Sequence, residues 1–258
     1  METFLIFLGV GFLAQLVDGA LGMAYGLISS SVLVAFGVPP ATASATVHGA
    51  KLFTTAASAA SHSFHRNVNW RLFFPLAAAG IAGGITGVLL ITSVQAAQVK
   101  PWVLAYFGVM GFYILWRALK KREPRRVRRH WMGPLGLVGG FLDAIGGGGW
   151  GPTVTTTLLG AGVEPRQAIG TVNTAEFFVS VAVVAAFATT LLTGHWEEAS
   201  GIGDHAVAVA GLIVGGLAAA PFAGWTTKHV PMRPMTFAVG ALVVGLAAWQ
   251  IAQIAGWL

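Results

Sequence analysis

The residue whose type and position most strongly suggest chemistry is Lys51, which lies in an apolar stretch rich in Ala, Ser and Thr. A charged side chain at the centre of a membrane helix costs roughly 2.5–3.5 kcal/mol on insertion scales, so such residues are usually functional. If residues 41–61 form a helix, four polar residues spaced by four, three and four positions share one face of it. They are Ser44, His48, Lys51 and Thr55. With an ammonium group for charge and other groups as hydrogen-bond donors, this stripe could bind an anion.

Lys51 has an alternative interpretation as half of a structural ion pair. Its partner would be one of three carboxylates in apolar surroundings, namely Asp18, Asp143 or Glu176. Intramembrane charges often pair, and a buried pair can hold a fold together without binding a ligand. Glu176 could also take up a proton, which would change the charge of a central cavity by one unit and couple to alternating access. The residues alone leave both interpretations open.

The two aspartates have a further role that their positions suggest. Asp18 and Asp143 each separate two short apolar runs and stand at the predicted start of the second run. A carboxylate at the start of a helix can accept hydrogen bonds from backbone N–H groups that lack a partner within the helix. We therefore predict a structural cap at both positions, with a coupling carboxylate as the alternative.

Residues 145–152 read Ile-Gly-Gly-Gly-Gly-Trp-Gly-Pro, the most unusual stretch of the chain. Without side chains at Gly147, Gly148 and Gly149, backbone N–H groups can approach a ligand, and the following helix directs its positive end there. The alternative is close helix packing, which the GxxxG spacing of Gly147 and Gly151 favours. Since no Lys-Ser/Thr follows the glycines, the sequence does not support nucleotide binding.

Sequence patterns of common catalytic centres are missing from the chain. It contains neither HExxH nor GxSxG, and its lack of cysteine removes thiolate metal sites and thiol nucleophiles. We expect no enzymatic activity and no catalytic residue, and we assign no metal ion and no cofactor.

The composition places the polar residues inside a membrane. Only 9% of the 258 residues are charged and 55% are apolar, whereas a soluble domain carries about 25% charged residues. The net charge of +6 is local, because eight of the fifteen Lys and Arg residues lie within residues 117–129. A soluble enzyme and a nucleic-acid-binding domain are thereby excluded, and an all-α polytopic membrane protein is predicted.

An internal repeat with an offset of 125 residues organises the chain. The match runs without a gap from Val38 and Val163 to Phe53 and Phe178. The pairs that matter for chemistry are Asp18/Asp143, His48/Asn173 and Lys51/Glu176. We predict an N-terminal transmembrane repeat over residues 1–117, a basic linker over 118–131 and a C-terminal transmembrane repeat over 132–258.

Each repeat is predicted to contain a re-entrant or short-helix hairpin followed by three transmembrane helices. The runs that form the hairpins are 3–17 with 19–36, and 132–142 with 144–160. Each run is short for a full crossing, which needs about 17–25 residues. The remaining helices are expected over 41–61, 72–99 and 101–116 in the first repeat, and over 166–184 with 177–196, 205–227 and 234–258 in the second.

The distribution of Lys and Arg predicts the orientation. The basic linker should be cytoplasmic. Both chain ends, with Glu197, Glu198 and Asp204, should then lie outside. An odd number of crossings in each half makes the repeats inverted, and inverted repeats with interrupted helices are typical of secondary transporters whose site lies near the membrane midplane.

The paired motifs resemble a known family. Asp-Gly-Ala-Leu-Gly-Met-Ala-Tyr-Gly at residues 18–26 and Val-Pro-Pro-Ala-Thr-Ala-Ser-Ala-Thr-Val-His-Gly-Ala-Lys at 38–51 resemble the TauE/SafE family of sulfite exporters. The second copy, at residues 139–152 and 169–176, is similar to that family too, and the resemblance covers the whole chain. It implies a multi-pass protein of the bacterial inner membrane that transports sulfur-containing anions such as sulfite, sulfoacetate or other organosulfonates.

We therefore expect a secondary carrier for a small sulfur-containing anion, with the anion and the lipid bilayer as its partners and no role for nucleic acid. The expected substrate-binding residues are Ser44, His48, Lys51, Gly147, Gly148, Gly149, Asn173 and Thr174, and the expected coupling or ion-pair residues are Glu176, Asp18 and Asp143. The sequence leaves the oligomeric state undetermined. Two alternatives are a cation- or proton-coupled carrier of another substrate and a non-transporting membrane sensor or assembly protein.

Overall fold

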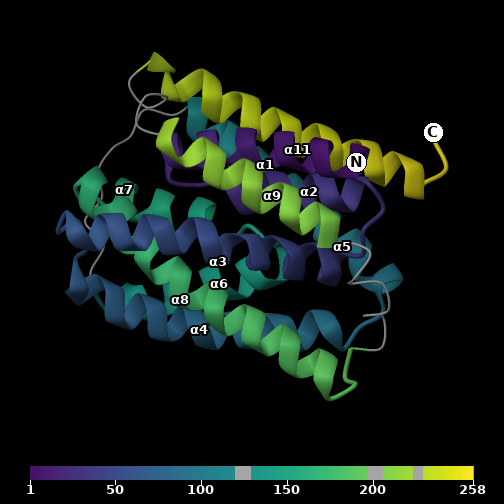
Figure 1. Ribbon diagram of the computed structural model, residues 1–258, viewed down its shortest axis with the longest axis horizontal. Helices are drawn as coiled ribbons and strands as arrows, with labels where there is room; N and C mark the ends of the chain where they lie inside the picture. The colour runs from purple at the N-terminus through teal and green to yellow at the C-terminus, as the bar shows by residue number, and fades with distance from the viewer. Residues whose placement is uncertain (120–128, 197–205, 223–228, 258) are drawn as a thin grey trace.

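The computed structural model describes residues 1–119, 129–196, 206–222 and 229–257, and these residues form helices joined by short turns, without a strand (Figure 1). The helices of the first half are α1 (Glu2–Leu21), α2 (Tyr25–Ala35), α3 (Pro40–Phe64), α4 (Trp70–Thr92) and α5 (Ala96–Leu119). After a 3₁₀ turn over Arg129–Trp131, the second half contains α6 (Met132–Gly146), a π-helical turn (Gly151–Thr155) that leads into α7 (Thr156–Gly160), α8 (Pro165–Leu192), α9 (Ala206–Ala219) with a 3₁₀ turn (Ala220–Phe222), and α11 (Met232–Ile254).

Five of these helices, α1, α4, α5, α8 and α11, are long and apolar enough to cross a membrane. Large apolar side chains such as Phe74, Trp102 and Phe112 are exposed along them, which suits contact with lipid rather than water. The prediction of an all-α polytopic membrane protein is therefore confirmed. The two overlapping runs predicted over 166–196 form a single helix, α8.

The sequence prediction placed the helix breaks of both hairpins too early. Asp18 and Asp143 lie inside α1 and α6, and each helix continues to a glycine with a left-handed backbone, Gly22 (φ 68°) and Gly147 (φ 71°). Glycine adopts this conformation without a steric penalty, so it sets the helix end. As a result α1 has 20 residues and reaches the length of a membrane crossing, so the prediction that this run is short was wrong.

The helices pack in pairs that join the two halves of the chain. α4 packs against α6, α1 against α9, α5 against α11, and α3 against α8. Glycines permit the first two contacts: a Cβ at Gly140 would lie 2.1 Å from the Gly80 carbonyl oxygen, and one at Gly215 would lie 2.1 Å from that of Leu8. The glycine pairs 80/84 and 211/215 thus serve helix packing, as their GxxxG spacing indicates.

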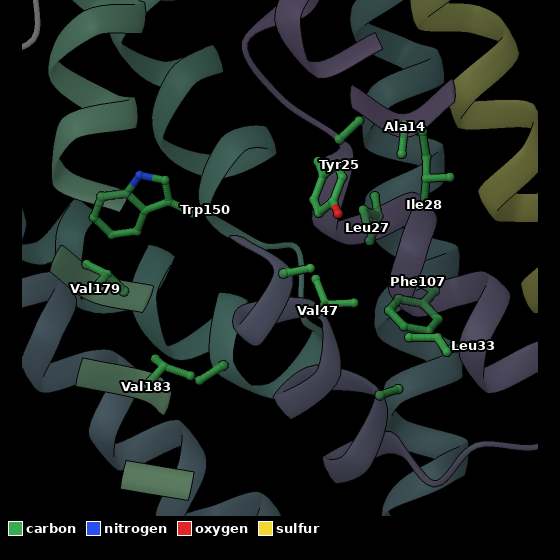
Figure 2. Packing of buried hydrophobic residues seen from close by; sticks show 14 of the residues in the cluster. Ala14, Tyr25, Leu27, Ile28, Leu33, Val47, Phe107, Trp150, Val179 and Val183 are labelled. Atoms are coloured by element: carbon green, nitrogen blue, oxygen red, sulfur yellow. The ribbon is translucent and has the colours of Figure 1, made fainter. Parts of the chain in front are cut away.

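The two hairpin turns approach each other between α3 and α8. In Figure 1 the chain termini lie at one end of the molecule and α7 at the other. Figure 2 shows the first residue of each returning helix in its own group of core side chains, Tyr25 beside Leu27, and Trp150 beside Val179 of α8. This arrangement places Asp18 and Asp143, one turn before the breaks, in the interior.

Several residues used to predict the orientation lie outside the described part of the chain. They are most of the basic linker (residues 120–128), Glu197, Glu198 and Asp204. The division into repeats over 1–117 and 132–258 and the cytoplasmic position of the linker stay predictions.

Candidate functional site: a charged cluster beside a polar cavity

Four side chains from three helices form one buried charged cluster. Lys51 of α3 lies with its Nζ 3.0 and 2.9 Å from the two carboxylate oxygens of Asp143 on α6, and 2.7 Å from Oε1 of Glu176 on α8. The Nε2 atom of His48, on α3, lies 3.1 Å from Oδ2 of Asp143. The side chains of Lys51 and Asp143 are 3% and 0% exposed, and that of Glu176 is 12% exposed. Lys51 thus forms ion pairs with two of the three carboxylates considered as its partners.

Asp143 is held from several directions. Besides its contacts with Lys51 and His48, its Oδ1 accepts a hydrogen bond from the backbone N–H of Trp150 at 3.1 Å. The predicted cap is confirmed, although Asp143 belongs to the helix before the break rather than to the one that it caps. The Trp150 indole Nε1 in turn donates to the Val172 carbonyl at 3.1 Å, which ties this turn to α8. The carboxylate is thus rigidly placed, and it cannot move away from Lys51 without breaking these bonds.

His48 lies between two hydrogen-bond acceptors. Its Nδ1 is 2.9 Å from the Ser44 carbonyl oxygen, while its Nε2 faces the Asp143 carboxylate. The same Nδ1 lies 3.4 Å from the Ser44 hydroxyl, so the ring is held between the backbone of α3 and the Asp143 carboxylate. The Ser44 hydroxyl donates to the Ala144 carbonyl at 2.5 Å, so the polar stripe on α3 faces the end of α6.

The polar residues of α8 fall into two groups. Asn173 donates from Nδ2 to the Ser58 hydroxyl on α3 at 2.9 Å and faces a cavity. Thr174 is buried and donates to the Gly170 carbonyl of its own helix at 2.7 Å. The structure thus brings Glu176 into the charged cluster and Asn173 into the cavity wall, and it turns the Thr174 hydroxyl to its own backbone.

Asp18 occupies the position equivalent to Asp143 in the other half, with the same cap and different surroundings. Its Oδ1 accepts from the backbone N–H of Tyr25 at 3.1 Å, which confirms the predicted cap. No ion pair to Asp18 occurs among the described residues. Asp18 is half-buried, and it lines a polar cavity of about 430 Å³ together with Thr55, Ser58 and Asn173. This cavity reaches the rim residue Arg166, whose side chain is 69% exposed.

Comparison with known proteins identifies the family of the chain. A family model described as "Sulfite exporter TauE/SafE" matches residues 7–249. The chain is a member of the TauE/SafE family. A relative from Bacillus subtilis (strain 168), the "Probable membrane transporter protein YtnM", is 38% identical over 251 residues, which cover 95% of this chain and 81% of the relative. No solved structure matches the chain. The family and this relative make the chain a membrane transporter, and the resemblance that the motifs indicated is confirmed.

The glycines of this TauE/SafE protein are closely packed, two of them against the other hairpin. A Cβ at Gly148 would lie 1.9 Å from the Leu27 backbone nitrogen, and one at Gly147 would lie 2.4 Å from the Ser30 hydroxyl. A Cβ at Gly149 would meet the backbone of α6 at Leu142. Close packing is therefore an observed role for all three glycines, whereas binding of substrate by their N–H groups stays a prediction.

Several polar residues of the cavity were missing from the sequence prediction, among them Ser58 and Arg166. Ser58 lies seven positions after Lys51, so extending the α3 stripe by one more helical step would have included it. Arg166 stands in the first turn of α8, where it could not be distinguished in the sequence from an arginine at any other helix end. Among the described residues, no group of three or more His, Asp or Glu side chains is arranged to hold a metal ion.

Proposed function

We propose that the chain is a secondary carrier for a small sulfur-containing anion such as sulfite, sulfoacetate or another organosulfonate. The observation that carries this proposal is the Lys51 ammonium, which is 3% exposed and lies between carboxylates of the other half of the chain. A buried ammonium in the membrane interior marks a binding site or a substrate pathway by default. The substrate site would lie around Lys51, between the two halves and near the membrane midplane.

The polar cavity supports an anion pathway that leads to this lysine. Thr55 lies one helical turn beyond Lys51 and lines the cavity, and Asn173 lies one turn before Glu176. Hydroxyl and amide groups can donate hydrogen bonds to sulfonate oxygens. Arg166 at the rim contributes a positively charged side chain, whose Nε lies 3.9 Å from Oε1 of Glu164. A volume of about 430 Å³ is ample for a small sulfur oxyanion.

The sulfur chemistry of the substrate is supported by the description of the matching family, a sulfite exporter family. The direction of transport is not part of the proposal. We further propose that the chain resides in the bacterial inner membrane with the central linker in the cytoplasm. The two halves then act as inverted repeats that expose the site to each side in turn.

Transport by purified protein in liposomes tests the proposal. Vesicles loaded with labelled sulfite, sulfoacetate or taurine should release at least one of them faster than protein-free vesicles. Lys51→Ala should abolish that release, because it removes the one cation that contacts both carboxylates among the described residues. Lys100→Ala, at the start of α5 and outside the cluster, should leave it unchanged. Release no faster than from protein-free vesicles, or full activity of Lys51→Ala, would contradict the proposed function.

A further inference from the structure

The ammonium of Lys51 is shared unequally between its two carboxylates. Asp143 contacts it with both oxygens and is also fixed by His48 and by the Trp150 N–H. Glu176 contacts it with Oε1 at 2.7 Å, and it is the more exposed of the two carboxylates. An incoming anion that competes for Lys51 should therefore displace Glu176 much more easily than Asp143.

The cluster has no spare positive charge for a substrate. The ammonium of Lys51 is already shared between the carboxylates of Asp143 and Glu176. An added anion would leave an uncompensated negative charge in a buried site, which is strongly unfavourable. Protonation of one carboxylate restores the balance, and the freed carboxylate is the one that can accept the proton.

The charged groups around Glu176 make it the proton acceptor once it leaves Lys51. It faces Lys51 on α3, and the charges of Asp143 on α6 and Asp18 on α1 act on it. Among the described neighbours of α8, residues 151–160 contain no charged side chain, and α4 carries only Arg71, in its first turn. When an anion occupies Lys51, Glu176 is therefore the carboxylate of the cluster that loses its cation, since Lys51 is the one cation that contacts it among the described residues.

We propose that the substrate anion takes the place of Glu176 on Lys51, that Glu176 binds one proton from the cavity water, and that anion and proton cross the membrane together. Lys51 keeps its proton throughout. On the opposite side the anion leaves, the carboxylic acid releases its proton to water, and the Lys51–Glu176 pair forms again. This inference rests on the proposed function, and it assigns the coupling ion and the residue that carries it.

The ratio of protons to anions in proteoliposomes tests this inference. Vesicles are loaded with the sulfonate that moves fastest in the flux test and with a pH-sensitive dye, and the membrane potential is clamped with potassium and valinomycin. A sulfonate is the right probe, because the protonation of sulfite would itself change the pH. Outward flux should make the lumen alkaline by one proton per anion.

Glu176→Gln carries a neutral side chain like that of the protonated acid. It should still exchange labelled for unlabelled sulfonate, and the pH of the lumen should no longer change. Glu2→Gln, the same substitution at an exposed carboxylate, should retain both flux and proton movement.

Three outcomes would overturn the inference while leaving the proposed function intact. They are wild-type sulfonate flux without proton movement, proton movement that persists in Glu176→Gln, and loss of exchange in a Glu176→Gln protein that elutes from gel filtration as the wild type does. If that variant aggregates, the wild-type ratio alone decides. Failure of the wild type to move any sulfur anion would instead overturn the proposed function itself.

Discussion

The two hairpins have the same local design and different surroundings. In each, an aspartate in the last turn of the first helix accepts the N–H of the residue seven positions later, Asp18 from Tyr25 and Asp143 from Trp150, both at 3.1 Å. The sequence repeat thus preserves a backbone cap in both copies. The cap explains why an aspartate is needed at each break, but it does not explain the charged cluster.

The hairpins differ in the side chains of the neighbouring helix that face each aspartate. Asp143 lies against His48 and Lys51 of α3, whereas the repeat places Asn173 and Glu176 of α8 opposite Asp18. One aspartate is therefore fully buried against Lys51 and His48, and the other is half-buried beside a polar cavity. One side of the site is closed by ion pairs while the other is accessible, which is the asymmetry expected of a single state of a carrier.

The largest difference in stability between the two hairpins should appear when each aspartate is neutralised in turn. Asp143→Asn keeps an oxygen for the Trp150 cap but leaves His48 and Lys51 without their shared carboxylate, so it should lower the free energy of unfolding by about 3–5 kcal/mol. Asp18→Asn, which also keeps its cap and loses no ion pair among the described residues, should cost less than about 1 kcal/mol. Unfolding in detergent, followed by tryptophan fluorescence, measures both. Equal losses would show that the two sites do not differ as described.

The contact between the hairpins should respond to a single methyl group. Gly148 takes the repeat position of Met23, and a Cβ there would overlap the Leu27 backbone, which cannot move like the end of a side chain. Gly148→Ala should therefore destabilise the protein by about 1–3 kcal/mol. Gly133→Ala, in α6 of the same hairpin but with open space around it, is the matched control and should not destabilise. A harmless Gly148→Ala would mean that the hairpins are not in contact.

Solvent accessibility should differ between the two sides of the site. Because the chain has no cysteine, a single introduced cysteine can be labelled to measure it. Ser58 lines the cavity, while Val183, its partner at an offset of 125, is fully buried. A charged maleimide should label Ser58→Cys more than about tenfold faster than Val183→Cys. A buried cysteine reacts only after the protein opens locally, and an opening that costs ~1.4 kcal/mol already slows labelling tenfold. Added substrate that drives alternating access should bring the two labelling rates closer together. Similar rates without substrate would contradict the asymmetry.

Sequence patterns predicted the parts of the site that depend only on residues close together in the sequence. The helical stripe of Ser44, His48 and Lys51 and the capping by both aspartates need only spacing and residue type. The choice of partner for Lys51 does not follow from them. Asp143 is 92 residues away in the sequence, and it competes with Asp18 and Glu176 until the helices are placed.

The errors at the hairpins have a physical cause as well. The sequence suggested that the chain would break at the aspartates, but Gly22 and Gly147 end the helices because glycine adopts the left-handed backbone there without a steric penalty. The packing of the glycines at residues 147–149 could not be derived from the repeat either. It depends on contact with α2, from the half of the chain in which those glycines have no complete counterpart.

The smallest effect isolates the cap itself, at the aspartate where no ion pair obscures it. Asp18→Ala removes both the charge and the acceptor for the Tyr25 N–H and should cost about 1 kcal/mol, the usual value of a lost helix cap. Asp18→Asn removes the charge alone, so the difference between the two variants in the same detergent unfolding measurement gives the contribution of the cap. If both variants unfold alike, the hydrogen bond at 3.1 Å contributes little. The repeated aspartate would then have to be explained by its charge, and Asp18 would resemble Asp143 more closely than the structure indicates.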